Sequence, residues 1–282
     1  MRWLVTGAKG MLGQDLVALL GDRGHDVVGI DREEADITDP SSVAGLVDGF
    51  DLVANCAAYT AVDAAEAEES TAFGVNSVGP ALLARAARAA GARMVQISTD
   101  YVFAGNATEP YGESAPIAPR SAYGRTKAAG EWAVRAEAPD HLIVRTAWLY
   151  GAHGACFPKT IARVARERGH LDVVADQVGQ PTWTADLAQL VLRLVESGAP
   201  AGIYHGTSSG RTSWFEFARA VVSAAGMDPA MVRATASTES DRPARRPAFS
   251  VLGHDGLVDV GVAPIGAWGE RWELAASSVL AG

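Results

Sequence analysis

The residues most suited to catalysis are a tyrosine and a lysine four positions apart, Tyr123 and Lys127. The surrounding sequence predicts a helix, so the two side chains share one face. An ammonium beside a phenol stabilises the phenolate and lowers the tyrosine pKa toward working pH. Such a tyrosine passes a proton to a carbonyl oxygen as hydride arrives at carbon, and Thr99 can give that oxygen a second hydrogen bond. These three residues predict reduction of a ketone, with Lys127 also available to a nicotinamide ribose.

A tyrosine and lysine at this spacing occur by chance in many chains, so the context decides their meaning. The chain opens with an apolar run, Trp3-Leu4-Val5, followed by glycines at positions 7, 10 and 13 and then by apolar residues at helical spacing. A strand that turns through glycines into a helix brings backbone N–H groups against a pyrophosphate. The alternative is a tight turn between strand and helix that binds nothing.

A second cofactor signal follows the strand expected over Asp26–Ile30. Asp31 lies about 20 positions after the glycine turn, where a carboxylate holds the adenosine ribose of a dinucleotide. Arg32 and Lys9 are placed to neutralise a 2′-phosphate, although a charged loop without a ligand is the alternative. The combination predicts a preference for NADPH, with NADH also accepted.

The positioning elements alternate between strand and helix as far as Thr146, which predicts an α/β fold with a Rossmann-like, doubly wound parallel sheet. We expect residues 1–150 to form the dinucleotide-binding domain. A long helix is expected over roughly residues 67 to 90. After Gly151 the rhythm changes, and residues 151–282 are expected to form a smaller α/β part, mainly for substrate binding, packed on the first.

Composition restricts the classes of partner. The net charge of −9 argues against a nucleic-acid binder, and no apolar run reaches the length of a membrane helix. No signal segment is evident, and the two cysteines, Cys56 and Cys156, form no CxxC pair, so a reducing cytoplasm is expected. The six histidines are scattered, and no metal site is predicted from them.

Several stretches together resemble the dTDP-4-dehydrorhamnose reductase family of extended short-chain dehydrogenases/reductases. The matching stretches are 7–13, 36–39, 55–63, 98–103, 123–127, 145–151, 176–177 with 181–182, and 246–247 followed by Ser250. The resemblance implies NADPH-dependent reduction of the C4 ketone of dTDP-4-dehydro-6-deoxy-L-mannose to dTDP-L-rhamnose. The implied partner is therefore a small nucleotide-sugar, and Thr99, Tyr123 and Lys127 are the implied catalytic residues.

The resemblance also implies the residues around the two ligands. The expected cofactor residues are Gly7, Lys9, Gly10, Met11, Leu12, Gly13, Asp31, Arg32, Asp36, Ile37, Ala57, Ala58, Tyr59, Tyr123 and Lys127. The expected substrate residues are Val62, Asp63, Thr99, Tyr101, Trp148 and Arg246. Arg246 is included because a guanidinium binds phosphate oxygens bidentately and neighbouring prolines stiffen its loop, the alternative being a surface arginine.

Two departures from the family pattern leave the sugar open. The chain has Cys156 and Phe249 where the family often has asparagine. One alternative is therefore a 4-ketoreductase of another dTDP-deoxysugar in a secondary-metabolite pathway, and a second is a non-catalytic, cofactor-binding regulatory subunit. Some family members hold Mg²⁺ at a dimer contact, but Thr184 stands where one of the acids is expected beside Asp15, so no metal is assigned. Both a monomer and a homodimer stay open.

Overall fold

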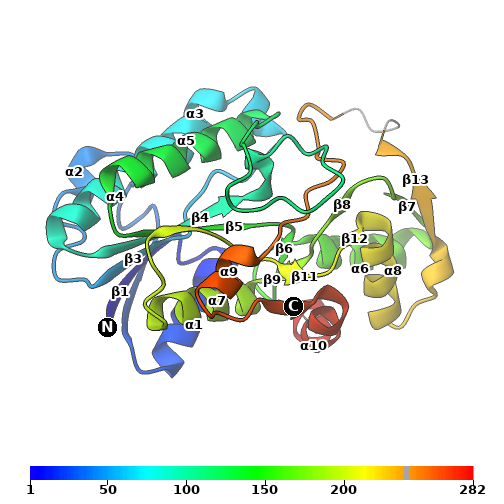
Figure 1. Cartoon of the computed structure of the whole chain (residues 1–282). Helices are drawn as coiled ribbons and strands as arrows, with labels where there is room; N and C mark the ends of the chain where they lie inside the picture. Colours follow the sequence, from blue (N-terminus) through cyan, green and yellow to red (C-terminus); the bar gives the residue numbers. More distant parts are fainter. Residues whose placement is uncertain (238–241, 282) are drawn as a thin grey trace.

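The centre of the molecule is a sheet of six parallel strands with helices on both faces (Figure 1). The computed structural model describes residues 1–237 and 242–281. The strands lie in the order β10-β5-β4-β3-β1-β2. Their bounds are β1 (Arg2–Thr6), β2 (Asp26–Ile30), β3 (Leu52–Asn55), β4 (Arg93–Thr99), β5 (His141–Thr146) and β10 (Gly202–His205). The strand order changes direction between β1 and β3, so the predicted doubly wound fold is confirmed.

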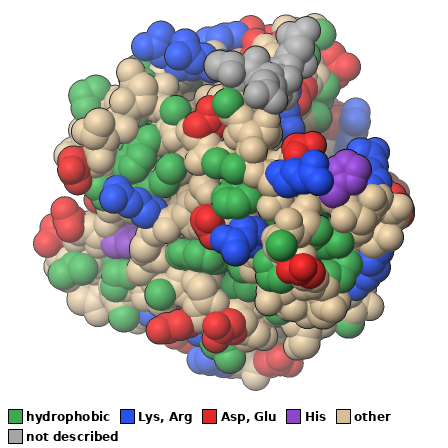
Figure 2. All heavy atoms as spheres, turned by 90° about the vertical axis from the view of Figure 1, so that its right-hand side faces the viewer, with side chains coloured by type: hydrophobic (Ala, Val, Ile, Leu, Met, Phe, Trp, Pro, Cys, Tyr) green, Lys and Arg blue, Asp and Glu red, His purple; other side chains and the backbone are tan. Residues whose placement is uncertain are grey.

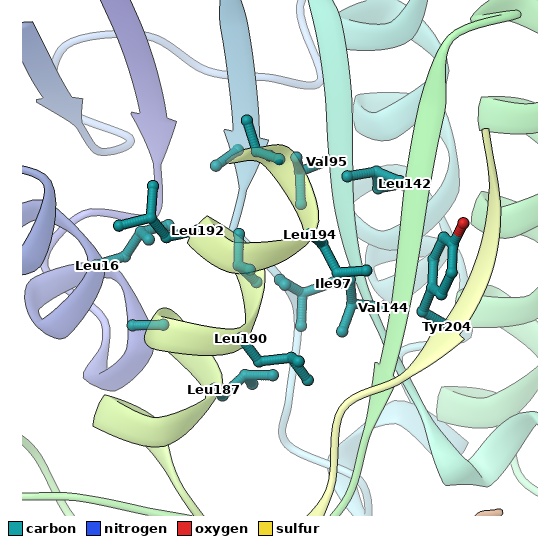
Figure 3. Close-up of a cluster of buried hydrophobic side chains, with 14 of the residues drawn as sticks. Leu16, Val95, Ile97, Leu142, Val144, Leu187, Leu190, Leu192, Leu194 and Tyr204 are labelled. Atoms are coloured by element: carbon teal, nitrogen blue, oxygen red, sulfur yellow. The ribbon is translucent and has the colours of Figure 1, made fainter. Parts of the chain in front are cut away.

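Alternating side chains of the strands build a separate core on each face of the sheet. Trp3 and Val5 point to the face covered by α1 (Met11–Asp22) and α7 (Thr184–Glu196), whereas Leu4 points to the other face. Figure 3 shows leucines of α7 packed against β4 and β5. The second face is covered by α2 (Pro40–Val43), α4 (Gly79–Ala90) and α5 (Ala122–Glu137).

The predicted division at residue 150 leaves out two elements of the sheet layer. Helix α7 packs on α1, and β10 pairs in parallel with β5, with Gly202 opposite Leu142. Both elements come after residue 150 in the sequence, yet they belong to the central sheet and the helices that cover it. An edge strand of four residues between two loops carries no local mark of the sheet to which it belongs, because pairing is a tertiary choice.

The remaining elements form the smaller C-terminal part, on the right in Figure 1. Its helices are α6 (Phe157–Arg168), α8 (Trp214–Ala224) and α10 (Trp268–Ala281), with the short α9 (Asp255–Asp259) beside β10. Its strands pair two by two: β6 (Leu149–Tyr150) with β9 (Thr182–Trp183), β7 (Leu171–Val174) with β13 (Val232–Thr235), β8 (Val178–Gly179) with β12 (Thr212–Ser213), and β11 (Ser208–Ser209) with β14 (Ile265–Ala267). Its core is rich in aromatic rings from α6, α8 and α10.

The long helix expected over residues 67 to 90 is interrupted. Helix α3 (Glu69–Phe73) passes into a π-helical turn over Gly74–Val78 before α4 begins. The buried amide of Asn76 lies in this turn and bonds to the backbone of Tyr59, at 2.9 Å to its N–H and 3.1 Å to its carbonyl. Such π-turns concentrate at functional sites, and this one is stabilised by a contact from outside the helix.

Two observations concern the possible partners of the protein. Over the described residues, the helices include none with the length and apolar character needed to span a bilayer. Figure 2 looks onto the C-terminal part and shows basic and acidic side chains interspersed over that face.

Candidate active site

A cavity of about 660 Å³ opens at the carboxyl edge of the sheet, among the loops that follow β1, β2 and β3. Because the strand order changes direction between β1 and β3, this is the position where doubly wound sheets bind ligands. The predicted cofactor residues that line it are Gly7, Lys9, Gly10, Asp31, Arg32, Asp36, Ile37, Ala57, Ala58 and Tyr59. Residues distant in the sequence therefore meet in one cavity.

The glycine turn has the geometry of a cradle for a backbone-bound ligand. Gly7 has a φ of +68°, and a Cβ at this position would lie 2.6 Å from the amide nitrogen of Ala57. A Cβ at Gly13 would lie 2.2 Å from the carbonyl oxygen of Gly7. Gly7 thus allows the β1 and β3 loops to approach, and Gly13 allows α1 to start close beneath them.

Three predicted cofactor residues of this turn do not line the cavity. Leu12 is buried in the core under the sheet, Gly13 lies beneath Gly7, and Met11 packs toward the C-terminal part. Helix α1 begins at Met11, with Gly10 as its N-cap. Since the cavity meets the turn at Gly7, Lys9 and Gly10, the residues after them support the cradle from behind.

Asp31 plays a structural part at the far end of the cavity. One carboxylate oxygen accepts from the Lys9 N–H at 3.0 Å and the other from the Arg32 N–H at 2.9 Å. The Arg32 guanidinium is exposed and 3.8 Å from the Asp36 carboxylate, and the Lys9 ammonium is paired with Glu33. Asp31 therefore joins the β1 and β2 loops and holds two cationic residues at the rim.

Asn76 is a site residue that the sequence analysis missed. Besides holding the Tyr59 backbone at the cavity wall, its amide donates to Thr126 Oγ1 on α5 at 3.1 Å. One buried amide thus ties the β3 loop to the helix that carries Tyr123 and Lys127. The available signal was a lone amide in a stretch of small apolar residues, where a polar side chain needs a specific partner.

The three proposed catalytic residues come from two adjacent elements. Thr99 ends β4, and Tyr123 lies in the first turn of α5, which Ser121 caps through the Gly124 N–H at 3.1 Å. A Cβ at Gly124 would lie 2.3 Å from the Tyr101 carbonyl oxygen, so glycine lets α5 approach the end of β4. The Thr99 hydroxyl donates to Asp100 Oδ1 at 2.9 Å and lies near the Tyr123 phenol, whose pKa it acts to lower.

The expectation of a depressed tyrosine pKa is wrong for the protein alone. Burial raises the pKa of Tyr123 to about 12, and the Asp100 carboxylate adds to the rise against the Thr99 hydrogen bond. In the protein alone, the Lys127 ammonium makes no contribution to this pKa; it is buried and donates to the Ile97 carbonyl at 2.6 Å. The phenol is therefore fully protonated at neutral pH, which is the state a proton donor needs.

Lys127 is adjacent to a buried ionic network. Burial lowers the pKa of its ammonium to about 8, against the opposing charge of Glu131. Glu131 binds Arg145 through two hydrogen bonds of 2.8 and 2.7 Å and accepts from Ser98 Oγ at 2.5 Å. Cys56, a lining residue of the cavity, is also close to Lys127. Burial raises the pKa of the Cys56 thiol to about 12, against the lowering effect of the Lys127 charge. Lys127 and Tyr123 were also predicted as cofactor residues, and neither lines the cavity itself.

Most of the predicted substrate residues gather beside Tyr123. The Tyr101 and Tyr123 rings meet edge to face, with centroids 5.4 Å apart. Arg246 pairs with Asp63 at 2.7 Å, and Arg246 lines a small hollow together with Tyr101. Val62 is half-buried just before Asp63. Although burial opposes it, the Arg246 guanidinium lowers the net pKa of Asp63.

Trp148, another predicted substrate residue, lies in the loop after β5. Its ring stacks on Trp214, with centroids 3.5 Å apart and an interplanar angle of 8°. For metals, the described part of the chain contains no group of three or more His, Cys, Asp or Glu side chains suited to hold an ion. Asp15 lies 3.6 Å from His153 Nε2.

Comparison with known proteins places this geometry in a family. The model of the RmlD substrate binding domain family matches residues 1–280. A dTDP-4-keto-6-deoxy-D-glucose reductase of Streptomyces niveus is 49% identical over 270 residues, 95% of this chain and 93% of that protein. A dTDP-4-dehydrorhamnose reductase of Streptomyces griseus is 48% identical over 274 residues, 95% of this chain and 90% of that one. The solved dTDP-4-dehydrorhamnose reductase of Bacillus anthracis, in complex with NADP, has a TM-score of 0.93 and 39% identity, covering 97% of this chain and 98% of its own.

Proposed function

The chain belongs to the RmlD substrate binding domain family, and on this premise we propose that it reduces the C4 ketone of dTDP-4-dehydro-6-deoxy-L-mannose to dTDP-L-rhamnose with NADPH. The observation that carries the proposal is the placement of Thr99 beside a buried, protonated Tyr123, with Lys127 one helical turn further along α5 and close to Cys56 of the cavity wall. The turn after β1 supports the dinucleotide, because Gly7, Lys9 and Gly10 line the cavity with little side chain to obstruct it at the two glycines.

In this proposal the three residues have different tasks. NADPH, when bound, supplies the hydride that reaches C4 of the sugar. The Tyr123 hydroxyl gives its proton to the C4 oxygen, so the ketone becomes an alcohol, and the Thr99 hydroxyl holds that oxygen in line. Lys127 holds the nicotinamide ribose and supplies positive charge as the phenol loses its proton.

The cofactor preference depends on Arg32. Replacing Arg32 with alanine is expected to raise the Kd of NADPH about tenfold and leave that of NADH nearly unchanged, since a charge-assisted bond to the 2′-phosphate is lost. Fluorescence titration of both cofactors measures this. Arg23→Ala, at another exposed arginine, is the control. Equal weakening of both cofactors would show that Arg32 does not meet the 2′-phosphate.

Arg246 is proposed to bind the diphosphate of the nucleotide-sugar. Asp63 and the Ala244 carbonyl, at 2.7 and 3.1 Å, hold its guanidinium beside Tyr101. Arg246→Ala is expected to raise the KM of the nucleotide-sugar about 10- to 100-fold with little change in NADPH affinity. Steady-state kinetics measures this, with the exposed Arg163→Ala as the control. An unchanged KM would make Arg246 a structural partner of Asp63 only.

A second candidate function differs in the sugar. The relative from Streptomyces niveus is named for a different 4-keto sugar, and the chain has its own residues at two family positions: buried Cys156, the N-cap of α6, and half-buried Phe249. NADPH oxidation with enzymatically generated dTDP-4-keto-L-rhamnose tests the first candidate, and further-deoxygenated analogues test the second. Cofactor binding without turnover on either class would favour the non-catalytic subunit.

A further inference from the structure

Trp148 has a backbone conformation that is costly for a bulky residue. Its φ is +48°, and over residues 1–237 and 242–281 every other residue with positive φ is a glycine. The backbone is held there on its carboxyl side, where the Thr182 N–H donates to the Trp148 carbonyl at 3.2 Å and β6 pairs with β9. Strain of this kind persists where the surrounding structure imposes it, and it concentrates at ligand sites.

Gly179 leaves the space that the Trp148 ring occupies. A Cβ at Gly179 would lie 2.5 Å from Cε2 and 2.6 Å from Cζ2 of the indole. Gly179 is buried in β8 and has no positive φ, so its backbone would accept any residue. Glycine is therefore required at this position by the neighbouring ring and not by the chain's own conformation.

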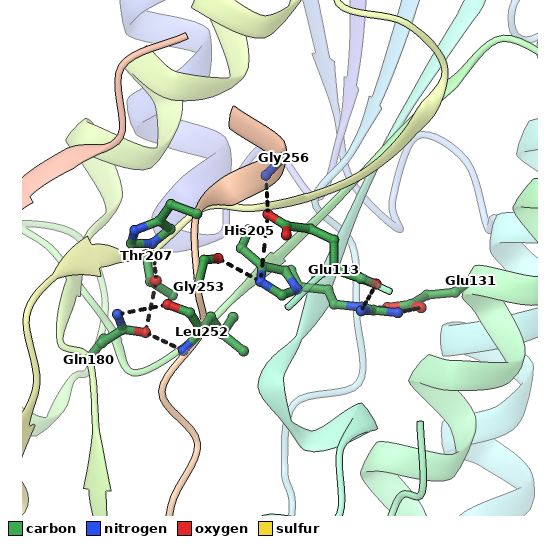
Figure 4. A network of polar contacts seen from close by, with 10 residues as sticks. Glu113, Glu131, Gln180, His205, Thr207, Leu252, Gly253 and Gly256 are labelled. Atoms are coloured by element: carbon green, nitrogen blue, oxygen red, sulfur yellow. Dashed lines mark hydrogen bonds and ion pairs between the residues drawn. The ribbon is translucent and has the colours of Figure 1, made fainter. Parts of the chain in front are cut away.

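The strand that carries Gly179 is fixed on all sides. Val178 bonds to Ala248 and to Ser250 through its backbone, each at 2.9 Å, and Gly179 pairs with Thr212 of β12. Figure 4 shows the next residue, Gln180, joined by its side chain to Thr207 and to the backbone of Leu252. A methyl group added at Gly179 would therefore displace the indole rather than the strand.

The Trp148 indole is also fixed by stacking on Trp214. The two rings are nearly parallel, and Trp214 is itself packed against Phe157, with ring centroids 4.4 Å apart. Trp214 begins α8 immediately after β12, whose Ser213 pairs with Val178 of β8. The glycine slot and the stacking partner therefore belong to one paired unit, and both fix the same ring.

We propose that Gly179 and Trp214 are positioning residues that hold the Trp148 indole as a rigid apolar wall for the pyranose ring of the substrate. The proposal rests on the proposed function. Thr146 is the β5 partner of Thr99 in β4, so Trp148 emerges two residues beyond the partner of a catalytic residue. A wall that is fixed in advance orients the sugar without ordering a side chain on binding.

Gly179→Ala tests the wall by kinetics. We expect kcat/KM for the nucleotide-sugar to fall about tenfold or more, because small misplacements at a substrate site are costly, with NADPH Kd unchanged. The matched control is Gly202→Ala in β10, where a new Cβ meets only ordinary contacts at 3.8 Å. An unchanged kcat/KM in a folded Gly179→Ala protein would overturn the proposal.

A double-mutant cycle identifies the route of the effect. In the background of Trp148→Phe, whose smaller ring leaves room for the methyl group, Gly179→Ala should lower kcat/KM for the nucleotide-sugar by less than twofold. If the full loss returned in that background, Gly179 would act through something other than the indole, and the proposal would fail.

The stacked indoles also provide a readout that needs no substrate. Two tryptophan rings stacked this closely couple their electronic transitions, and the wild-type protein should show a matching pair of circular dichroism bands of opposite sign. Trp214→Phe should abolish this pair and Gly179→Ala should weaken it, with the unfolding temperature measured alongside. Retention of the bands in folded Gly179→Ala would overturn the positioning role, whereas a wild type inactive on the sugar with bands that respond as expected would overturn the proposed function only.

Discussion

Replacing Tyr123 with phenylalanine is expected to lower kcat by about 10²- to 10⁴-fold, or some 3–5 kcal/mol of activation free energy. The variant loses one hydroxyl, the proposed proton donor to the C4 oxygen, and keeps the ring that packs on Tyr101. A donor that acts as charge develops contributes mainly in the transition state, so NADPH affinity should hardly change. Thr99 remains to hold the carbonyl oxygen.

Steady-state kinetics and a fluorescence titration of NADPH measure the two sides of this expectation. The matched control is Tyr204→Phe, which removes a hydroxyl that donates to the Pro200 carbonyl at 2.8 Å, at the edge strand. A Tyr123→Phe enzyme with near-normal kcat would contradict the mechanism if hydride transfer limits its turnover. A primary isotope effect with 4-deuterated NADPH shows whether it does.

Replacing Lys127 with alanine is expected to lower kcat by about 10²-fold or more and also to weaken NADPH binding. The two effects occur together because one ammonium is proposed to serve both the phenol and the nicotinamide ribose. The control is Lys127→Met, which keeps the length and removes the charge. If either variant lost rate but bound NADPH normally, Lys127 would have no contact with the cofactor.

The same lysine predicts the basic limb of the pH profile. Its pKa of about 8 lies below the ordinary value of 10.5, so the ammonium is charged below about pH 8 and neutral above it. kcat/KM of the free enzyme should therefore fall as pH rises through about 8. Tyr123, with a pKa of about 12, stays protonated throughout this range and does not cause the loss. A constant kcat/KM up to pH 10 would show that the charge on Lys127 is not needed.

Local signals predicted most of the elements that surround the proposed dinucleotide cavity. The glycine turn and the strand ending at Ile30 both depend on residues close in sequence, and the structure has both of them. Where a prediction needed the environment, it was wrong or incomplete. The phenol pKa rises because Tyr123 is buried, while Lys127 is bonded to the Ile97 carbonyl. Neither fact can be predicted from the spacing of the two residues in the sequence.

The remaining features depend on contacts between distant parts of the chain. Asp63 meets Arg246 across 183 positions, and Asn76 reaches both Tyr59 and Thr126. Gly179 reads as a turn residue in a short loop until the Trp148 ring is seen beside it. These pairings depend on the packed fold and were therefore beyond a reading of single motifs, although the residue types at either end were recognisable.

The most direct test of the account follows the hydride. The purified protein is given dTDP-4-keto-L-rhamnose and NADPH that carries deuterium on the transferred position, and the product is isolated and its C4 is assigned by NMR. The account predicts that the wild type forms dTDP-L-rhamnose with one deuterium at C4. Tyr123→Phe should form this product at least about 10²-fold more slowly. Turnover that leaves hydrogen at C4, or places deuterium elsewhere in the sugar, would contradict reduction of the C4 ketone at this site.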